Sequence, residues 1–362
     1  MKKLKKKILV IIQRSNGDVF YSFSLIKALH ENYAASKIDL LVNDDTCATA
    51  KLIPFVNKII TFSYQKKNNI GWRQDLAIIY SIFKKYDICI NLTASDRSVI
   101  FALFAGKVVI SPVESENKKN WWKKILLTHF YFFDFNRHIL LNNLKPLNYL
   151  QVNVENIHYS IQTSKECTSK VKAKLESLGV KDFFIFHPSA QYLYKVYPLK
   201  LRNTLLSSLD KLGVSIIITG SDNAIDLDIK KQIPLLNNVI DLIGETTLEE
   251  YLAISELSLG YIGMDTLNMH IAASQNKRIF AIFGPTNLRM WSPWSNYLKS
   301  SAIFNQPIQT YGKITIFQAD MPCVACGKAG CNDNFGNSDC LDNISPRLIF
   351  DHVNKWYQRE RI

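Results

Sequence analysis

Short, continuously apolar runs that each end in polar residues constrain the fold of this chain more than any other feature. In the first half they occupy residues 7–12, 38–42, 86–94 and 107–112, with helical spacing at 20–32 and 96–106. Such runs are typical of parallel strands, which are buried on both faces. Strands that alternate with helices form βαβ units. The first half is therefore predicted to be a doubly wound α/β domain.

The same pattern restarts near residue 182. Thr247 and Glu250 form a capping-box pattern ahead of a helix. We predict an α/β protein with two Rossmann-like, doubly wound parallel-sheet domains facing a cleft. The predicted domains are residues 1–165, residues 166–345 with a Cys-rich segment at 322–341, and a C-terminal helix at 346–362. Residues 118–138 and 145–180 are expected to join the halves. The apolar runs behind the second domain lie at 183–190, 214–221, 238–245, 257–263 and 278–286, with a helix at 199–212.

Charge and cysteine content narrow the possible partners. The 362 residues carry a formal net charge of +13, which favours anions such as nucleic acid, an acidic lipid leaflet or phosphorylated substrates. No apolar run approaches the roughly 20 residues needed to cross a bilayer. The N-terminal apolar stretch is too short for a signal peptide, and an odd cysteine count of 7 argues against a disulfide-stapled secreted protein. We therefore expect a cytoplasmic protein.

Polar clusters follow five of the predicted strands. Doubly wound sheets bind ligands beyond the carboxyl ends of their strands, so the clusters predict a ligand site. The five clusters lie at residues 15–18, 187–190, 220–222, 263–270 and 284–286.

The first cluster supplies a candidate base. Asp18 could accept a proton from an attacking hydroxyl, and Ser15, Asn16 and Gly17 precede it in the same loop. The alternative is structural: Gly17 suits a tight turn, and Asp18 suits the N-cap of the following helix.

The clusters of the second half supply donors for a diphosphate. Asp265 and Thr266 lie where a strand turns into a helix, and His270 lies about one turn further on. Free N–H groups at a helix start attract anions, and Lys195 could neutralise phosphate from a neighbouring loop. Asp226 could accept hydrogen bonds from ribose hydroxyls. The alternatives are a capped helix with a core-facing histidine, a solvated lysine, and an aspartate that caps a helix.

Four cysteines are spaced closely near the C-terminus: Cys323, Cys326, Cys331 and Cys340. Four thiolates within one short segment could surround a tetrahedral, structural zinc ion. Free thiols or a local disulfide are the alternatives. A catalytic zinc is not expected, because four protein ligands leave no open position.

The order of these motifs resembles glycosyltransferase family 9, the heptosyltransferases of bacterial lipopolysaccharide. The similar stretches are "KILVII…NGDVFYSFSLIKAL", "HPSA…K.YP", "ITGS", "LIGETTLEEYLAISE", "GMDTLNMHIAA" and "FGPTN…W.P". The resemblance implies a GT-B fold. It also implies an ADP-heptose donor, a lipopolysaccharide-core acceptor, and inverting transfer without an obligatory metal. Leu267 and Asn268 stand where the family usually has Gly-Pro.

The resemblance also implies a role for each candidate residue. Asp18 falls on the general base, and Lys195 on a lysine that contacts the donor phosphate. Asp265 would hold sugar hydroxyls, while Thr266 and His270 would hold the diphosphate. Asp226 lies near the position of an acidic residue that binds the ribose.

We therefore predict an inverting glycosyltransferase at the inner-membrane surface, where the N-terminal lysines and the stretch Trp121, Trp122, Lys123 and Lys124 would meet anionic lipid. Two alternatives stay open at this point. One is a sugar-nucleotide epimerase of GT-B type. The other is a zinc-stabilised nucleic-acid-binding protein. We expect no nucleic-acid partner, because the basic residues are dispersed and no helix-turn-helix or RNA-binding aromatic motif is present.

Overall fold

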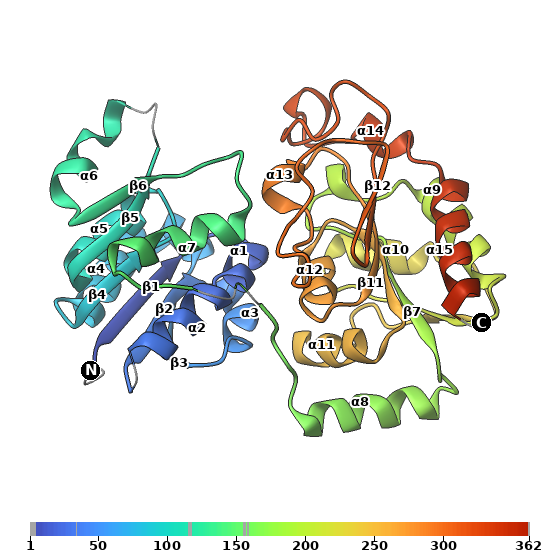
Figure 1. Ribbon diagram of the computed structural model, residues 1–362, viewed down its shortest axis with the longest axis horizontal. Helices are drawn as coiled ribbons and strands as arrows, with labels where there is room; N and C mark the ends of the chain where they lie inside the picture. Colours follow the sequence, from blue (N-terminus) through green and yellow to red (C-terminus); the bar gives the residue numbers. More distant parts are fainter. Residues whose placement is uncertain (1–4, 34, 115–117, 155–156, 158, 361–362) are drawn as a thin grey trace. The chain divides into compact units, whose positions relative to one another are not determined.

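The computed structural model describes residues 5–33, 35–114, 118–154, 157 and 159–360. The chain divides into two compact units, Met1–Tyr159 and Ser160–Ile362. Each unit is built on its own sheet (Figure 1). No helix in the described ranges combines the length and apolarity that crossing a bilayer would require.

The first unit contains a six-stranded sheet in the order β3-β2-β1-β4-β5-β6, and every neighbouring pair is parallel. The order reverses direction between β1 and β4, which is where doubly wound sheets bind ligands. The strands are β1 (Lys7–Ile12), β2 (Lys37–Asn43), β3 (Val56–Phe62), β4 (Tyr86–Asn91), β5 (Gly106–Val113) and β6 (His129–Phe132).

Helices cover both faces of this sheet. Right-handed crossovers place α4, α5 and α6 on one face, where Ile78, Phe101 and Leu127 share a core cluster with Leu9 and Cys89 of the strands. The other face carries α2 and α7, which pack on each other. The helices are α1 (Asn16–Tyr21), α2 (Phe23–Asn32), α3 (Cys47–Lys51), α4 (Tyr64–Ile82), α5 (Asp96–Ala105), α6 (Trp121–Leu126) and α7 (Ile139–Tyr149).

The prediction that residues 118–138 join the two halves is wrong. They form a short 3-10 helix, then α6, then β6, and so complete the first sheet. Trp122 and Phe130 pack against the core of the same unit, so burial of their rings holds the segment there.

The second unit contains a seven-stranded sheet in the order β12-β13-β11-β10-β7-β8-β9. Its strands are parallel except for the β12–β13 hairpin. The strands are β7 (Phe183–His187), β8 (Ser215–Ile218), β9 (Val239–Asp241), β10 (Gly260–Met264), β11 (Arg278–Ile282), β12 (Ile308–Tyr311) and β13 (Ile314–Phe317).

The helices of the second unit include a C-terminal one that belongs to its core. Rings of Trp356 and Tyr357 from α15 pack edge-on against Phe184 of β7. At α11, Thr247 and Glu250 form the predicted capping box. The helices are α8 (Lys165–Ser177), α9 (Leu199–Asp210), α10 (Ala224–Lys231), α11 (Leu248–Leu257), α12 (Leu267–Ser274), α13 (Leu288–Trp291), α14 (Asp339–Asp342) and α15 (Pro346–Glu360).

Strand β10 approaches its neighbour β7 unusually closely at Gly263. A Cβ atom at this position would lie 2.2 Å from the His187 carbonyl oxygen, which belongs to backbone that cannot turn aside. Gly263 pairs with His187 in the register of the two strands. Only glycine allows this approach, which sets the polar residues after β10 beside those after β7.

We predict that Gly263→Ala destabilises the second unit by at least about 1–3 kcal/mol, the usual cost of overpacking a core. Chemical denaturation followed by tryptophan fluorescence measures this loss. Gly213→Ala is the control, because Gly213 has φ +67° but a Cβ atom added there would meet nothing within 4 Å. Equal losses in both variants would show that the contact with His187 does not matter.

Candidate functional site

Asp18 lies buried at the start of α1, with 4% of its surface exposed. Arg14 Nε lies 2.8 Å from its Oδ1 atom. Ser15 donates to Oδ2 through its hydroxyl at 2.7 Å and through its backbone N–H at 3.3 Å. The carboxylate is therefore paired with the Arg14 guanidinium and hydrogen-bonded to Ser15. The structural alternative, Asp18 as the N-cap, is wrong in its position: Ser15 is the N-cap, and Asp18 is the third helical residue of a capping box.

The neighbours of Asp18 are also held by the fold. Asn16 accepts a hydrogen bond of 2.6 Å from Thr49 through its side-chain oxygen. Gly17 lies inside α1, so its predicted tight turn is wrong; the capping box starts the helix before it. Ser15, Asn16 and Gly17 thus form the first turn of a helix at the carboxyl end of β1.

Two polar residues at this edge were missed by the sequence analysis. Gln13 directly follows β1, Asn43 is the last residue of the neighbouring β2, and both are buried. The Gln13 amide nitrogen and oxygen and the Asn43 side-chain oxygen have no hydrogen-bond partner in the described structure. Buried amides without partners are costly, so this edge offers hydrogen-bonding capacity. The only sequence signal was two amides after apolar runs.

In the second unit, the turn after β10 brings three predicted residues together. Lys195 Nζ lies 3.5 Å from Asp265 Oδ2, although 70 residues separate them. Thr266 is the N-cap of α12 in extended conformation, and no side-chain cap hydrogen bond occupies its hydroxyl. The Tyr261 hydroxyl oxygen lies 3.4 Å from the Thr266 hydroxyl oxygen. A lysine ammonium and a hydroxyl therefore converge at the start of an eight-residue helix, which carries a partial positive charge.

His270 lies one turn into α12 and is 2% exposed. Burial lowers its pKa to about 3, and the positive charge of Lys195 adds to the effect. The ring is therefore neutral at neutral pH. It can donate one hydrogen bond to a diphosphate but brings no positive charge, so the cation of this cluster is Lys195.

His187, the last residue of β7, connects two strands and a helix and was missed as a site residue. Its Nδ1 atom lies 2.8 Å from the Thr219 carbonyl oxygen after β8. The Asn268 amide nitrogen lies 3.1 Å from the same ring atom and 3.4 Å from Nε2. Burial lowers the pKa of His187, against the opposing charge of Asp226. Its neutral ring ties the ends of β7 and β8 to α12.

Asp226 is buried and fully engaged with its own loop. Ser189 donates to its Oδ1 atom. Ser221 donates to Oδ2 through its backbone N–H at 2.5 Å and its hydroxyl at 2.8 Å, and Asn223 donates at 2.9 Å. Asn223 caps α10, so the alternative that Asp226 helps to cap a helix describes its observed contacts. Only 3% of Asp226 is exposed.

Comparison with known proteins identifies the family of this chain. The sequence profile of Glycosyltransferase family 9 (heptosyltransferase) matches residues 76–316. The chain belongs to this family. Lipopolysaccharide heptosyltransferase 3 of Escherichia coli K12 is 26% identical over 294 residues, covering 78% of this chain and 83% of that protein. Lipooligosaccharide heptosyltransferase 2 of Haemophilus influenzae is 24% identical over 311 residues, covering 80% and 86%.

Solved structures of family members share the fold. E. coli ADP-heptose lipopolysaccharide heptosyltransferase II matches with a TM-score of 0.73 at 18% identity, over 98% of this chain and all of that one. An E. coli heptosyltransferase solved with ADP matches with a TM-score of 0.71 at 13% identity, over 96% and 99%. The GT-B fold and the family resemblance are thereby confirmed. As a member of family 9, the protein is a glycosyltransferase, which decides against the epimerase and nucleic-acid-binding alternatives.

The structure does not support the zinc site predicted at Cys323, Cys326, Cys331 and Cys340. Among the residues that the structure describes, no three Cys, His, Asp or Glu side chains are placed to hold a metal ion. Cys323 and Cys326 are exposed, whereas Cys340 is buried. Burial and the nearby thiols raise the pKa of Cys340 to about 12. Backbone hydrogen bonds, such as Gly327 N–H to the Pro285 carbonyl at 2.6 Å, hold this segment.

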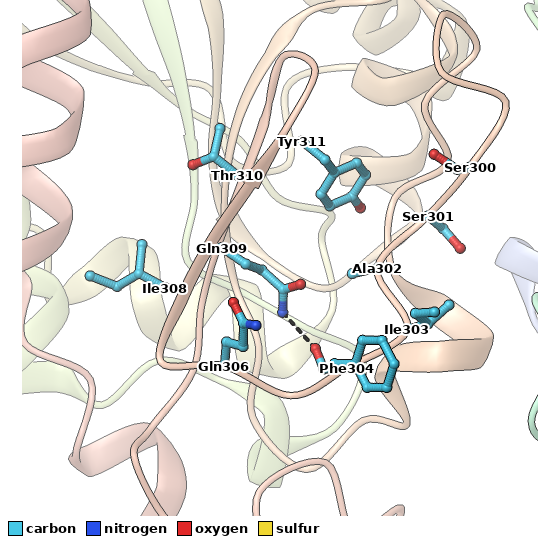
Figure 2. A pocket seen from close by; sticks show the side chains of 10 residues that line it. All are labelled: Ser300, Ser301, Ala302, Ile303, Phe304, Gln306, Ile308, Gln309, Thr310 and Tyr311. Atoms are coloured by element: carbon cyan, nitrogen blue, oxygen red, sulfur yellow. Dashed lines mark hydrogen bonds between the residues drawn. The ribbon is translucent and has the colours of Figure 1, made fainter.

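A pocket of about 390 Å³ lies elsewhere in this glycosyltransferase, beside the edge strand β12 (Figure 2). No charged side chain lines it, and the Tyr311 hydroxyl donates to the Pro293 carbonyl. None of the predicted site residues lines it. A nucleotide diphosphate needs cationic partners, so the Lys195 cluster is the better candidate for binding one.

The lowered pKa of His270 predicts a pH-dependent stability. An unfolded histidine binds a proton near pH 6.5, whereas folded His270 does so only near 3. Stability therefore falls as pH falls through this window, by about 2 kcal/mol for this group between about pH 7 and pH 5. In His270→Gln, the second unit should lose correspondingly less of its free energy of unfolding over that range. Denaturant titrations of both proteins at the two pH values test this. An equal loss of unfolding free energy in the wild type and in His270→Gln would contradict it.

Proposed function

We propose that this glycosyltransferase moves a heptose from ADP-heptose onto the lipopolysaccharide core, with inversion at the anomeric carbon. The observation that carries the proposal is the cluster of Lys195, Asp265, Thr266 and His270 at the carboxyl ends of the second sheet. Support comes from two relatives whose names specify lipopolysaccharide or lipooligosaccharide heptosyl transfer, and from an ADP-bound structure of the same fold.

Donor binding is assigned to the second unit. Lys195 would pair with the diphosphate, and binding would draw its ammonium away from Asp265. The released Asp265 carboxylate would then accept hydrogen bonds from sugar hydroxyls. Thr266 and neutral His270 would donate to phosphate oxygens, beside the positive end of α12. Asp226 would act near the ribose, where its present contacts with Ser189 and Ser221 order the loop that follows β8.

Chemistry is assigned to Asp18 in the first unit. The acceptor hydroxyl oxygen would form a bond to the anomeric carbon while the bond to the diphosphate breaks, and ADP leaves with that electron pair. Asp18 would take the hydroxyl proton, as a general base. Arg14 Nε, 2.8 Å from the carboxylate, would hold it in position until the acceptor binds. Ser15, Asn16 and Gly17 would lie on the acceptor side of this residue.

The reaction is proposed to take place at the inner-membrane surface, because the acceptor is a lipid-linked oligosaccharide. No metal ion is assigned an obligatory role, since Lys195 and the α12 start would offset the charge of the leaving diphosphate. Nucleic acid is not an expected partner.

We predict that Lys195→Ala and Thr266→Ala each weaken ADP binding. Hydrogen bonds to charged groups contribute about 1.5–3 kcal/mol, so each variant should lose roughly 10- to 150-fold in affinity. Isothermal titration with ADP measures the loss. Lys200→Ala is the matched control, because Lys200 is an exposed lysine at the start of α9. Unchanged ADP affinity in both test variants would overturn the donor assignment.

We predict that Asp18→Asn lowers kcat by about 10²–10⁴-fold, the usual contribution of a general base. Donor affinity should be retained, since the donor residues lie in the other unit. Ser15→Ala is the control, because it removes the hydroxyl that donates to the Asp18 carboxylate but leaves the carboxylate itself. If both variants lose activity equally and modestly, then Asp18 serves only to cap α1.

A further inference from the structure

Three helices of the first unit present large apolar side chains to solvent at spacings of four residues. On α4, Trp72, Leu76 and Tyr80 are 65%, 55% and 85% exposed. Residues four apart lie on the same side of a helix. The same spacing recurs on α5 and α6, whose exposed members are Ile100 and Phe104, and Trp121 and Ile125. Each helix therefore carries an outward apolar stripe.

The three stripes lie on one side of one sheet. Figure 1 shows α4, α5 and α6 in a row along the sheet, and their inner residues share one core cluster. Phe83, at the end of α4, lies 6.1 Å from Phe104 of α5, measured between ring centroids. Lys123 of α6 is bonded to Asp96 and to the Ala94 carbonyl at the start of α5. We call this surface of α4, α5 and α6 the outer helix layer.

The helices on the opposite face of the sheet lack such stripes. There α2 exposes Glu31 and Asn32, and α7 exposes Asn148 and Tyr149. Exposed aromatic and aliphatic residues scattered singly are ordinary, but a gathered set marks an interaction surface. The asymmetry between the faces shows that the outer helix layer is not an average surface.

The charges of the outer helix layer are one-sided. Its acids are paired within it: Asp75 pairs with Arg97, and Asp96 with Lys123. Three further bases lie over aromatic rings. Arg73 lies over the Trp72 ring at 5.3 Å, Lys84 over Phe83 at 5.3 Å, and Lys124 over Phe132 at 5.4 Å. Lys85 donates to the Ser81 carbonyl.

We propose that the outer helix layer is the surface through which this protein binds an anionic lipid bilayer. Tryptophan and tyrosine favour the interface between lipid headgroups and acyl chains. Lysine and arginine beside them attract anionic headgroups while their stems cover apolar surface. A second copy of this chain fits less well, because a symmetric pairing of two such faces would bring like charges together.

The structure also corrects which residues of the basic, aromatic stretch meet the lipid. Lys123 is 3% exposed and ion-paired, and Trp122 packs against the core. Trp121 and Lys124 remain outward, joined by Ile125 and Leu126. This inference rests on the proposed function in one respect: a lipid-linked acceptor is the reason for the protein to bind a bilayer. The residues of the outer helix layer are separate from those of the proposed donor site.

Vesicle sedimentation tests the proposal. The wild-type protein should bind acceptor-free vesicles made of equal parts of phosphatidylethanolamine and phosphatidylglycerol. It should bind far more weakly to vesicles of phosphatidylcholine alone. A stripe variant, Trp72→Gln with Leu76→Gln and Tyr80→Gln, should lose at least tenfold in vesicle affinity. A charge variant, Lys84→Glu with Lys85→Glu and Lys124→Glu, should lose as much at low salt, because headgroup attraction is screened by ions.

Matched controls come from the second unit. Leu178→Gln with Leu235→Gln and Tyr297→Gln removes three exposed apolar side chains. Lys181→Glu with Lys200→Glu and Lys211→Glu makes the same change in charge at exposed lysines. Both controls should bind vesicles as the wild type does. Circular dichroism confirms that the stripe and charge variants are folded.

Turnover on a detergent-free, delipidated acceptor separates this proposal from the proposed function. The stripe variant should keep that turnover while losing vesicle binding, whereas Asp18→Asn should lose turnover and keep vesicle binding. Wild-type affinity for vesicles in the stripe variant would overturn the bilayer surface. The proposal would also be overturned if light scattering showed the wild type to be a dimer and the stripe variant to be a monomer.

Discussion

The approach of β10 to β7 at Gly263 determines where the donor-side residues lie. Because the two strands are parallel and in register, the residues after β10 emerge beside those after β7. Asp265 therefore meets Lys195 from the loop that follows β7, and Asn268 meets His187. A bulkier residue in place of the glycine would separate the strands at the point where their polar ends must converge.

The central strands could be predicted from sequence, but several edge strands could not. Strand β1 is buried from its second residue to its last, so its apolar run is unbroken. Strand β3 lies at an edge and exposes Asn57 and Lys58, which hides the pattern. Strand β6, also at an edge, is a short aromatic segment that looked like a connection. An edge strand is covered on fewer sides, so its composition carries less of the signal.

Which residue types would gather at the candidate site could be predicted, but their partners could not. Doubly wound topology places polar residues at strand ends, so Asp18 and Thr266 could be chosen in advance. The pairing of Asp18 with Arg14, and of Lys195 with Asp265, depends on side-chain geometry that no spacing specifies. Both ion pairs are partly buried, and such pairs hold charges in fixed positions at a cost in desolvation. Substrate would therefore exchange one charged partner for another, without having to order mobile side chains.

The start of α12 shows how this chain departs from the pattern of its family. Where the family usually has proline, Asn268 contributes a backbone N–H to the first turn of the helix, which a proline cannot do. Its side-chain amide also contacts the ring of His187. The neighbouring Leu267 gives up the conformational freedom of glycine, but the first helical position does not need it, since Leu267 is not in the left-handed region. The substitution thus exchanges a close backbone approach for an additional hydrogen-bond donor at the positive end of the helix. A diphosphate held there would meet more N–H groups and fewer glycine contacts, so the departure changes how the anion is held while keeping the means of attracting it.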